Sequence, residues 1–247
     1  MPQNVYDNPD FFQGYKSLRQ NDTGLNGAVE IPALQRLLPD LAERRLLDLG
    51  CGFGDFARYA RSHGAQSVEA IDVSEKMIAE AKRLTADVNI TFLQSSVEDF
   101  IPEAEHFHLV VSSMALHYIC DYRAVVKRVF KGLTAGGAFI FSVEHPSCTA
   151  NPVGWVRDAD GAPQHWPLDL YQSEGERQTS WFIDGVTKYH RTVETYVNTL
   201  VGEGFRLDHL GEPKPSPEIV DKRPWLAETL RRPPILLLAA TKPDVPK

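Results

Sequence analysis

The sequence predicts an α/β protein in which a mainly parallel sheet carries helices on both faces. Short apolar segments of strand length alternate with segments of helical periodicity between residues 31 and 143. One of these strands, residues 107–112, is a nearly continuous apolar run, which is typical of a parallel strand buried on both faces. A loop with three glycines follows the first strand, as in nucleotide-binding α/β sheets. Together these features predict a ligand pocket at the carboxyl edge of the sheet.

The elements follow one another in a regular order. Ile31, Leu34, Leu37 and Leu38 have helical spacing, and Pro39 ends that helix. Ser74 is a typical N-cap for another helix. The expected strands are 45–49, 67–72, 89–94, 107–112, 138–143, 205–210 and 235–241, and the expected helices are 31–38, 55–62, 75–84, 122–133, 193–203 and 225–231, with a turn at 134–137.

The glycine loop has the pattern D-x-G-x-G-x-G from Asp48 to Gly54. A dinucleotide loop reads G-x-G-x-x-G, but the position of its third glycine is Asp55 here, and the G-K-[ST] ending of a triphosphate loop is missing. Asp48 and Asp55 would repel a pyrophosphate and would suit a cationic ligand. An ordinary glycine-rich turn is the alternative interpretation of this stretch alone.

An acid followed by G-x-G-x-G after the first strand resembles the first motif of the class I S-adenosylmethionine (SAM)-dependent methyltransferases. The resemblance covers residues 45–145 well and the rest loosely. It implies a Rossmann-like, seven-stranded, mostly parallel sheet with an antiparallel last strand, and a cap insert after the fifth strand. It also implies SAM as the cofactor and S-adenosylhomocysteine (SAH) as the product. Lys188 to Thr192 is similar to a segment of bacterial small-molecule methyltransferases of the type 11 kind.

Residues at the strand ends are expected to contact the cofactor, because ligands of open α/β sheets bind beyond the carboxyl ends of the strands. Asp72 can accept hydrogen bonds from both ribose hydroxyls, and Met77 either packs on the adenine or belongs to the helix core. Ser96 occupies the position where the family has an adenine-reading Asp. The expected cofactor-binding residues are Asp48, Gly50, Cys51, Gly52, Asp72, Val73, Met77, Ser96, Val97 and Ser113, with Tyr15 and Arg19 from the N-terminal arm.

Three residues are candidates for catalysis. The resemblance places His117, which follows the fourth strand, at the border of the methyl-transfer centre in some family members, while a structural histidine is the alternative. Tyr189 and His190 are expected to face the acceptor, since a neutral histidine can take a proton near pH 7. They end an insert rich in Trp, Tyr and Pro, at about 145–192, which suits the wall of a small-molecule cavity or simply packs on the core.

The length of 247 residues fits one domain, with a core of about 28–144 and 193–247, an arm at 1–27 and the insert. A net charge of -7 argues against nucleic-acid binding. Three cysteines without C-x-x-C spacing indicate neither a zinc site nor a disulfide framework, so we expect no metal. We also expect a cytoplasmic location. No apolar run is long enough for a membrane span. We expect a monomer or homodimer.

The leading hypothesis is therefore an enzyme that methylates a small-molecule acceptor held under an aromatic cap. A nucleic-acid or protein methyltransferase is an alternative, although the N-P-P-[YF] motif of base-modifying enzymes is replaced by Ser112-Ser113-Met114-Ala115. A nicotinamide-dependent oxidoreductase is disfavoured by the glycine spacing. A SAM-binding protein without methyl transfer remains open. The acceptor and its nucleophilic atom are not specified by these motifs.

Overall fold

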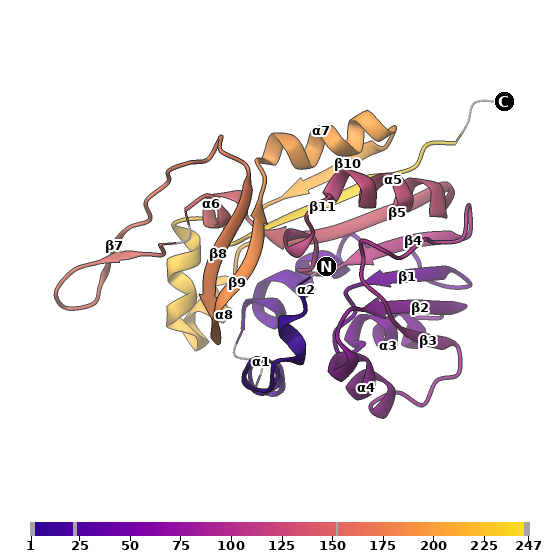
Figure 1. The fold of residues 1–247 in the computed structure, drawn as a ribbon, viewed down its shortest axis with the longest axis horizontal. Helices are drawn as coiled ribbons and strands as arrows, with labels where there is room; N and C mark the ends of the chain where they lie inside the picture. Colours follow the sequence, from indigo (N-terminus) through magenta and orange to yellow (C-terminus); the bar gives the residue numbers. More distant parts are fainter. Residues whose placement is uncertain (1–2, 22–23, 152, 245–247) are drawn as a thin grey trace.

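A computed structural model describes residues 3–21, 24–151 and 153–244, so a part of the arm lies outside the described residues. Its centre is a seven-stranded sheet with the order β10-β11-β5-β4-β1-β2-β3 (Figure 1). β11 is antiparallel to both of its neighbours, and the other pairs are parallel. This confirms the predicted fold class. The strands are β1 (Arg45–Leu49), β2 (Ser67–Asp72), β3 (Ile90–Gln94), β4 (Phe107–Ser112), β5 (Leu133–Glu144), β10 (Arg206–Gly211) and β11 (Ile235–Thr241).

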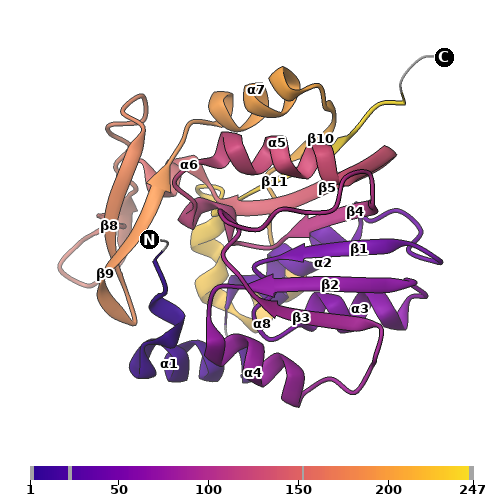
Figure 2. The same cartoon turned by 45° about the vertical axis from the view of Figure 1, so that its right-hand side comes forward.

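Each face of the sheet has its own apolar core. Successive residues of a strand point to opposite faces, so Leu46 and Leu47 of β1 belong to different clusters. Leu47 packs with α5 (Tyr122–Gly132) and α7 (Val193–Glu203), which lie together on one side of the sheet in Figure 2. Leu46 packs with α2 (Ile31–Gln35), α3 (Asp55–Ser62) and α4 (Glu75–Arg83). Ser74 caps α4 as predicted, by accepting the N–H of Met77.

The turn predicted at residues 134–137 is wrong, because β5 begins earlier, at Leu133. Leu133 pairs with Phe107, and the register then shifts, so that Ala138 pairs with Leu109. The Gly136 N–H donates to the carbonyl of Lys242, and the Lys242 N–H donates to Gly137. The glycines therefore form an irregularity in a long strand, because distant residues supply their hydrogen-bond partners.

The helix predicted at 31–38 is shorter and has a different beginning. α2 ends at Gln35, and a π-helical segment, η2 (Asn26–Glu30), comes directly before it. The helix predicted at 225–231 is a 3-10 helix, η4 (Pro224–Leu230), preceded by α8 (Pro217–Lys222). No helix of the described ranges is long and apolar enough to cross a membrane.

The insert between β5 and α7 contains regular structure that the sequence analysis did not predict. α6 (Pro146–Thr149) follows β5 directly. A small hairpin of β6 (Val156–Arg157) and β7 (Pro163–His165) comes next, and a longer hairpin of β8 (Gly175–Trp181) and β9 (Ile183–His190) ends the insert. In Figure 1 the longer hairpin stands beside the sheet, near the arm helix α1 (Pro9–Gln20).

The N-terminal arm connects the sheet domain to this hairpin. A 3-10 turn, η1 (Val5–Asp7), precedes α1. The Asp7 carboxylate accepts hydrogen bonds from the Ser74 hydroxyl at 2.5 Å and from the Lys76 N–H at 3.1 Å, at the start of α4. The ring of Phe11 is fully buried, with its centre 5.2 Å from that of Trp181 and 5.4 Å from that of Phe182 at the hairpin tip. The arm is thus held between two elements distant in sequence.

Replacing Phe11 tests this connection. Truncating a fully buried Phe costs about 3–5 kcal/mol, so Phe11→Ala should lower the free energy of unfolding by that amount in urea denaturation. The control is Phe12→Ala, because Phe12 is only partly buried and should cost less. Equal stability of Phe11→Ala and the wild type would show that the arm opens independently of the sheet domain.

Candidate active site

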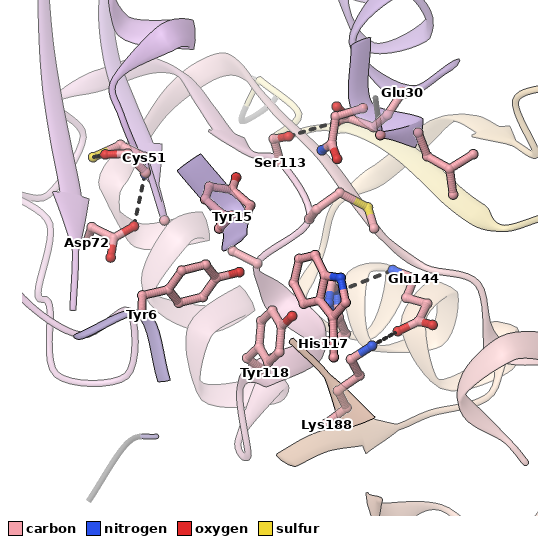
Figure 3. A pocket seen from close by; sticks show the side chains of 18 of the residues that line it. Tyr6, Tyr15, Glu30, Cys51, Asp72, Ser113, His117, Tyr118, Glu144 and Lys188 are labelled. Atoms are coloured by element: carbon pink, nitrogen blue, oxygen red, sulfur yellow. Dashed lines mark hydrogen bonds and ion pairs between the residues drawn. The ribbon is translucent and has the colours of Figure 1, made fainter. Parts of the chain in front are cut away.

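A cavity of about 780 Å³ lies at the carboxyl ends of the parallel strands. Its walls include residues that directly follow or end β1, β2, β3, β4 and β5. The arm and the β8–β9 hairpin contribute Tyr6, Tyr15 and Trp181. Figure 3 shows Tyr6, Tyr15 and Tyr118 around the same space as Asp72 and His117. The volume of the cavity lies within the range usual for small-molecule sites.

The glycine loop forms one wall of this cavity. The N–H groups of Gly50 and Cys51 both donate to the carbonyl of Ile71 at 2.9 Å, which ties the loop to β2. Gly50 has φ +77°, and a Cβ there would lie 2.5 Å from the Cβ of Ala115. Gly52 also has positive φ, but a Cβ there would meet no atom within 4 Å and would occupy open space. Glycine therefore keeps the backbone accessible to a ligand.

Two aspartates meet beside this loop. Asp72 Oδ2 accepts the Gly52 N–H at 2.9 Å, and Asp72 Oδ1 accepts the Ser74 N–H at 2.9 Å. Asp48 Oδ2 is buried and has no hydrogen-bond partner in the part of the chain that the structure describes. Burial raises the pKa of Asp48 to about 8, with further contributions from Asp72, Asp55 and Glu30. Burial likewise raises the pKa of Asp72 to about 6. This end of the cavity therefore favours a cation.

Glu30 is a third buried acid in the cavity wall and was missed by the sequence analysis. Its side chain is fully buried, and Oε1 accepts the hydroxyl of Ser113 at 2.9 Å (Figure 3). Oε1 also accepts the hydroxyl of Ser142 at 2.7 Å. Oε2 is buried, and no described residue donates a hydrogen bond to it. Burial raises the pKa of this carboxyl group. The available signal was an acid between two apolar residues, Val29 and Ile31, on a helix that faces the core.

All twelve residues expected to contact the cofactor line the cavity: Tyr15, Arg19, Asp48, Gly50, Cys51, Gly52, Asp72, Val73, Met77, Ser96, Val97 and Ser113. The side chains of Ser96 and Arg19 each pair with an aspartate. Ser96 Oγ donates to Asp99 Oδ2 at 2.6 Å and accepts the Asp99 N–H at 3.0 Å. Arg19 Nη2 lies 2.6 Å from Asp55 Oδ2, so this arginine bridges the arm and α3 across the glycine loop.

His117 also lines the cavity, and its hydrogen bonding defines its chemistry. The ring is almost completely buried, and Nδ1 accepts the backbone N–H of Glu144 at 3.2 Å (Figure 3). Burial lowers the pKa of His117 well below its usual value, assisted by the positive charges of Lys188 and Arg191. A neutral imidazole whose Nδ1 accepts must carry its proton on Nε2. His117 is therefore a hydrogen-bond donor at Nε2 and not a free base.

Tyr189 and His190 do not line the cavity, contrary to the expectation that they face the acceptor. Side chains alternate along β9, and Lys188 is the residue that faces the cavity, so Tyr189 points to the opposite side. His190 is fully buried below the hairpin. Its Nδ1 lies 2.8 Å from Thr149 Oγ1, and its Nε2 lies 2.9 Å from the carbonyl of Tyr171.

The other end of the cavity is built by the insert and the C-terminal segment. Lys188 Nζ lies 2.6 Å from Glu144 Oε2 and 6.0 Å from the centre of the Trp181 ring. Trp166, Arg177 and Arg232 line the same end, whereas Trp155 and Tyr171 do not line the cavity. His145, the residue after β5, does not line the cavity and contacts Ser147 and Glu212.

The fold and the site are those of an α/β protein that binds a nucleotide-like ligand at the carboxyl edge of its sheet. Comparison with known proteins identifies its family. The methyltransferase domain family matches residues 46–137. SAM-dependent methyltransferases from Mesorhizobium loti and Listeria monocytogenes are 43% and 42% identical to this chain. The Mesorhizobium loti structure covers 88% of this chain and 100% of its own, with a TM-score of 0.82. The Listeria monocytogenes structure covers 87% of this chain and 97% of its own, with a TM-score of 0.83. The chain belongs to the SAM-dependent methyltransferases, and SAM is its cofactor.

Curated relatives agree with this assignment. A Haemophilus influenzae protein of uncharacterised function is 32% identical over 96% of both chains. The trans-aconitate 2-methyltransferase of Mycolicibacterium gilvum is 30% identical, covering 68% of this chain and 67% of its own. The buried oxygens of Asp48 and Glu30, to which no described residue donates a hydrogen bond, and the open glycine loop fit a cationic nucleoside, so the residues present are suited to SAM.

The raised pKa of Asp48 predicts a pH-dependent stability. The folded-state pKa lies above the unfolded value of about 4, so this group stabilises the ligand-free protein at low pH, and that contribution is lost as pH rises toward about 8. We expect the melting temperature of the ligand-free protein to fall between pH 6 and 8, and Asp48→Asn to reduce this slope. The control is Asp221→Asn, at an exposed position of α8, which should keep the wild-type slope. A wild-type slope in Asp48→Asn would show that Asp48 does not cause the pH dependence.

The tautomer of His117 can be measured directly. In ¹⁵N-detected NMR of the ligand-free protein, His117 should show a protonated Nε2 and an unprotonated Nδ1 from pH 6.5 to 8, because burial lowers its pKa well below its usual value. The assignment comes from the spectrum of His117→Gln. Titration of His117 near pH 6.5, or a proton on Nδ1, would restore it as a candidate base.

Proposed function

We propose that this methyltransferase acts on a small-molecule acceptor enclosed beneath an aromatic cap. The cap consists of the β8–β9 hairpin and the N-terminal arm. The observation that carries this proposal is that rings of both elements line the cavity and lie close together: Tyr15 lies 5.3 Å from Tyr6 and 6.1 Å from Trp181, between ring centres. A cavity with aromatic walls suits a small organic acceptor better than a macromolecular one. A relative named for trans-aconitate supports a small acceptor.

The roles of the cofactor-facing residues are part of the proposal. We assign Asp72 to the ribose hydroxyls, Val97 and Met77 to the adenine, and Ser96 to ordering the loop that carries Val97. Asp48 supplies negative charge to the positively charged part of the cofactor. Glu30 Oε2, which is buried without a partner beside Ser113, receives the ammonium group of the methionine moiety. Arg19 and Tyr15 close the arm over that moiety.

At the acceptor end, the chain supplies position and polarity. SAM, when bound, provides an activated methyl group and leaves as SAH. His117 Nε2–H faces the cavity as a donor that orients the acceptor, and alignment supplies much of the acceleration in such a site. His190 holds β9 against Thr149 of α6 and thereby positions Lys188, so we assign it a positioning role.

We infer that arm, core and insert act as one domain, because the arm and the insert both wall the cavity formed by the core. Three free cysteines support a reducing, cytoplasmic environment.

Calorimetry with three ligands, SAM, SAH and 5′-methylthioadenosine, tests the cofactor roles, with NAD as a negative control. The wild type should bind the three ligands and should not bind NAD. Glu30→Gln should weaken SAM and SAH about 10- to 100-fold, because a charge-assisted hydrogen bond is lost. It should leave binding of 5′-methylthioadenosine unchanged, since this nucleoside lacks the amino-acid portion. Asp72→Asn should weaken all three ligands, because each carries the ribose.

The matched control is Glu75→Gln, which changes an exposed glutamate on α4 and should bind all three ligands normally. Equal loss of methylthioadenosine binding in Glu30→Gln would argue that Glu30 only maintains the fold. Transfer of labelled methyl from SAM to a panel of metabolites then tests the acceptor class. Binding of SAM without turnover on any acceptor would favour a protein that binds SAM without transferring methyl.

A further inference from the structure

The two ends of the cavity carry different ionisable groups. Asp48, Asp72 and Glu30 line the cofactor end, where Arg19 is paired with Asp55. At the acceptor end, Lys188 and Glu144 neutralise each other at 2.6 Å. Two further arginines line that end, and neither has a carboxylate partner among the residues that the structure describes: Arg177 and Arg232. The acceptor end therefore has an excess of positive charge.

Arg177 and Arg232 differ in how their guanidinium groups are used. Arg177 Nε donates to the carbonyl of Ala150 at 3.0 Å, and its other nitrogens also donate to backbone carbonyls, so it holds the insert together. Arg232 donates from Nη1 to Cys148 Sγ at 2.6 Å. Its Nε is buried without any partner, and Nη2 donates to no residue in the described ranges. An unsatisfied buried donor of this kind is costly.

The free edge of Arg232 is held in place by its surroundings. Its guanidinium carbon lies 3.8 Å from the centre of the Trp166 ring, so one face of the group is covered. Trp166 Nε1 donates to the carbonyl of Ser147 at 2.8 Å, which fixes the indole. Pro233 and Pro234 follow Arg232 and restrict its backbone. Nε and Nη2 form one edge of the guanidinium, and such an edge matches two oxygens of one anion.

We propose that the methyl acceptor carries an anionic group, a carboxylate or a phosphate, and that the Nε–Nη2 edge of Arg232 binds it. This inference rests on the proposed function, because it describes the acceptor of the same cavity. An anion at this position satisfies the buried Nε and neutralises the excess positive charge. It also places the anionic end of the acceptor beside Trp166, on the side of the cavity formed by the insert and the C-terminal segment.

Probe binding tests the site without knowledge of the natural acceptor. Benzoate, phenyl phosphate and the neutral benzamide are titrated into the full-length protein, with and without SAH, and followed by calorimetry and tryptophan fluorescence. We expect at least one anion to bind at least 10-fold more tightly than benzamide. Arg232→Gln should weaken the anion about 10- to 100-fold and leave benzamide unchanged, while Arg232→Lys, which keeps the charge without the planar edge, should lie between the two. The preferred anion distinguishes a carboxylate from a phosphate acceptor.

Arg231→Gln is the matched control. Arg231 is the exposed neighbour of Arg232, stacks on Trp155 and does not line the cavity, so its loss should leave anion binding unchanged. SAH binding by Arg232→Gln at wild-type affinity shows that the variant is folded.

Three results would overturn the anion site: benzamide binding as tightly as the anions, no anion binding to the wild type, or equal anion affinity in Arg232→Gln and the wild type. Failure of the wild type to bind SAH would count instead against the proposed function, and the titrations without SAH would still decide the anion site.

Discussion

The burial of three carboxylates at one end of a cavity is the constraint on which the site depends. A buried ionised carboxylate is costly unless it is paired, and Asp48 and Glu30 each keep one oxygen to which no described residue donates a hydrogen bond. Arg19, which also lines the cavity, forms its ion pair with Asp55. The protein thus retains a local electrostatic strain that a cationic ligand relieves. The sheet makes this possible, because parallel strands bring residues 48 and 72 together at one edge.

The closure of the cavity depends on contacts between elements that are far apart in the chain. The arm reaches the start of α4 through Asp7 and reaches the hairpin tip through Phe11. The hairpin in turn is anchored by His190 on α6, while Lys188 of the same strand faces the cavity. Aromatic rings of the arm and of the hairpin therefore meet at the cavity wall, and we expect a change in the arm to alter the packing of the hairpin.

Much of the fold was predictable because its strands are buried on both faces. β1, β2, β4 and β11 begin and end where the apolar runs predict. The β8–β9 hairpin was not predictable in the same way. Residues 175–181 of β8 are mostly polar, and their alternation follows exposure to solvent and not an apolar pattern. The turn predicted from the glycines at 136 and 137 was wrong for a related reason. Their hydrogen-bond partner, Lys242, is over one hundred residues away in the chain.

Residues of the site could be predicted from the local sequence pattern where the order of the strands brings them together. The glycine loop, Asp72 and the ends of β3 and β4 follow from strand order, because consecutive parallel strands deliver their carboxyl ends to one edge. The sequence alone determined the family and the cofactor, and it predicted twelve residues that line the cavity. Only the tertiary structure decided that His117 donates a hydrogen bond, that Lys188 replaces Tyr189 and His190 at the cavity wall, and that Glu30 and Arg232 face it. Those roles depend on which distant backbone or side-chain groups form a hydrogen bond with each polar atom. Hydrogen bonds between residues far apart in the chain produce no periodic pattern in the sequence.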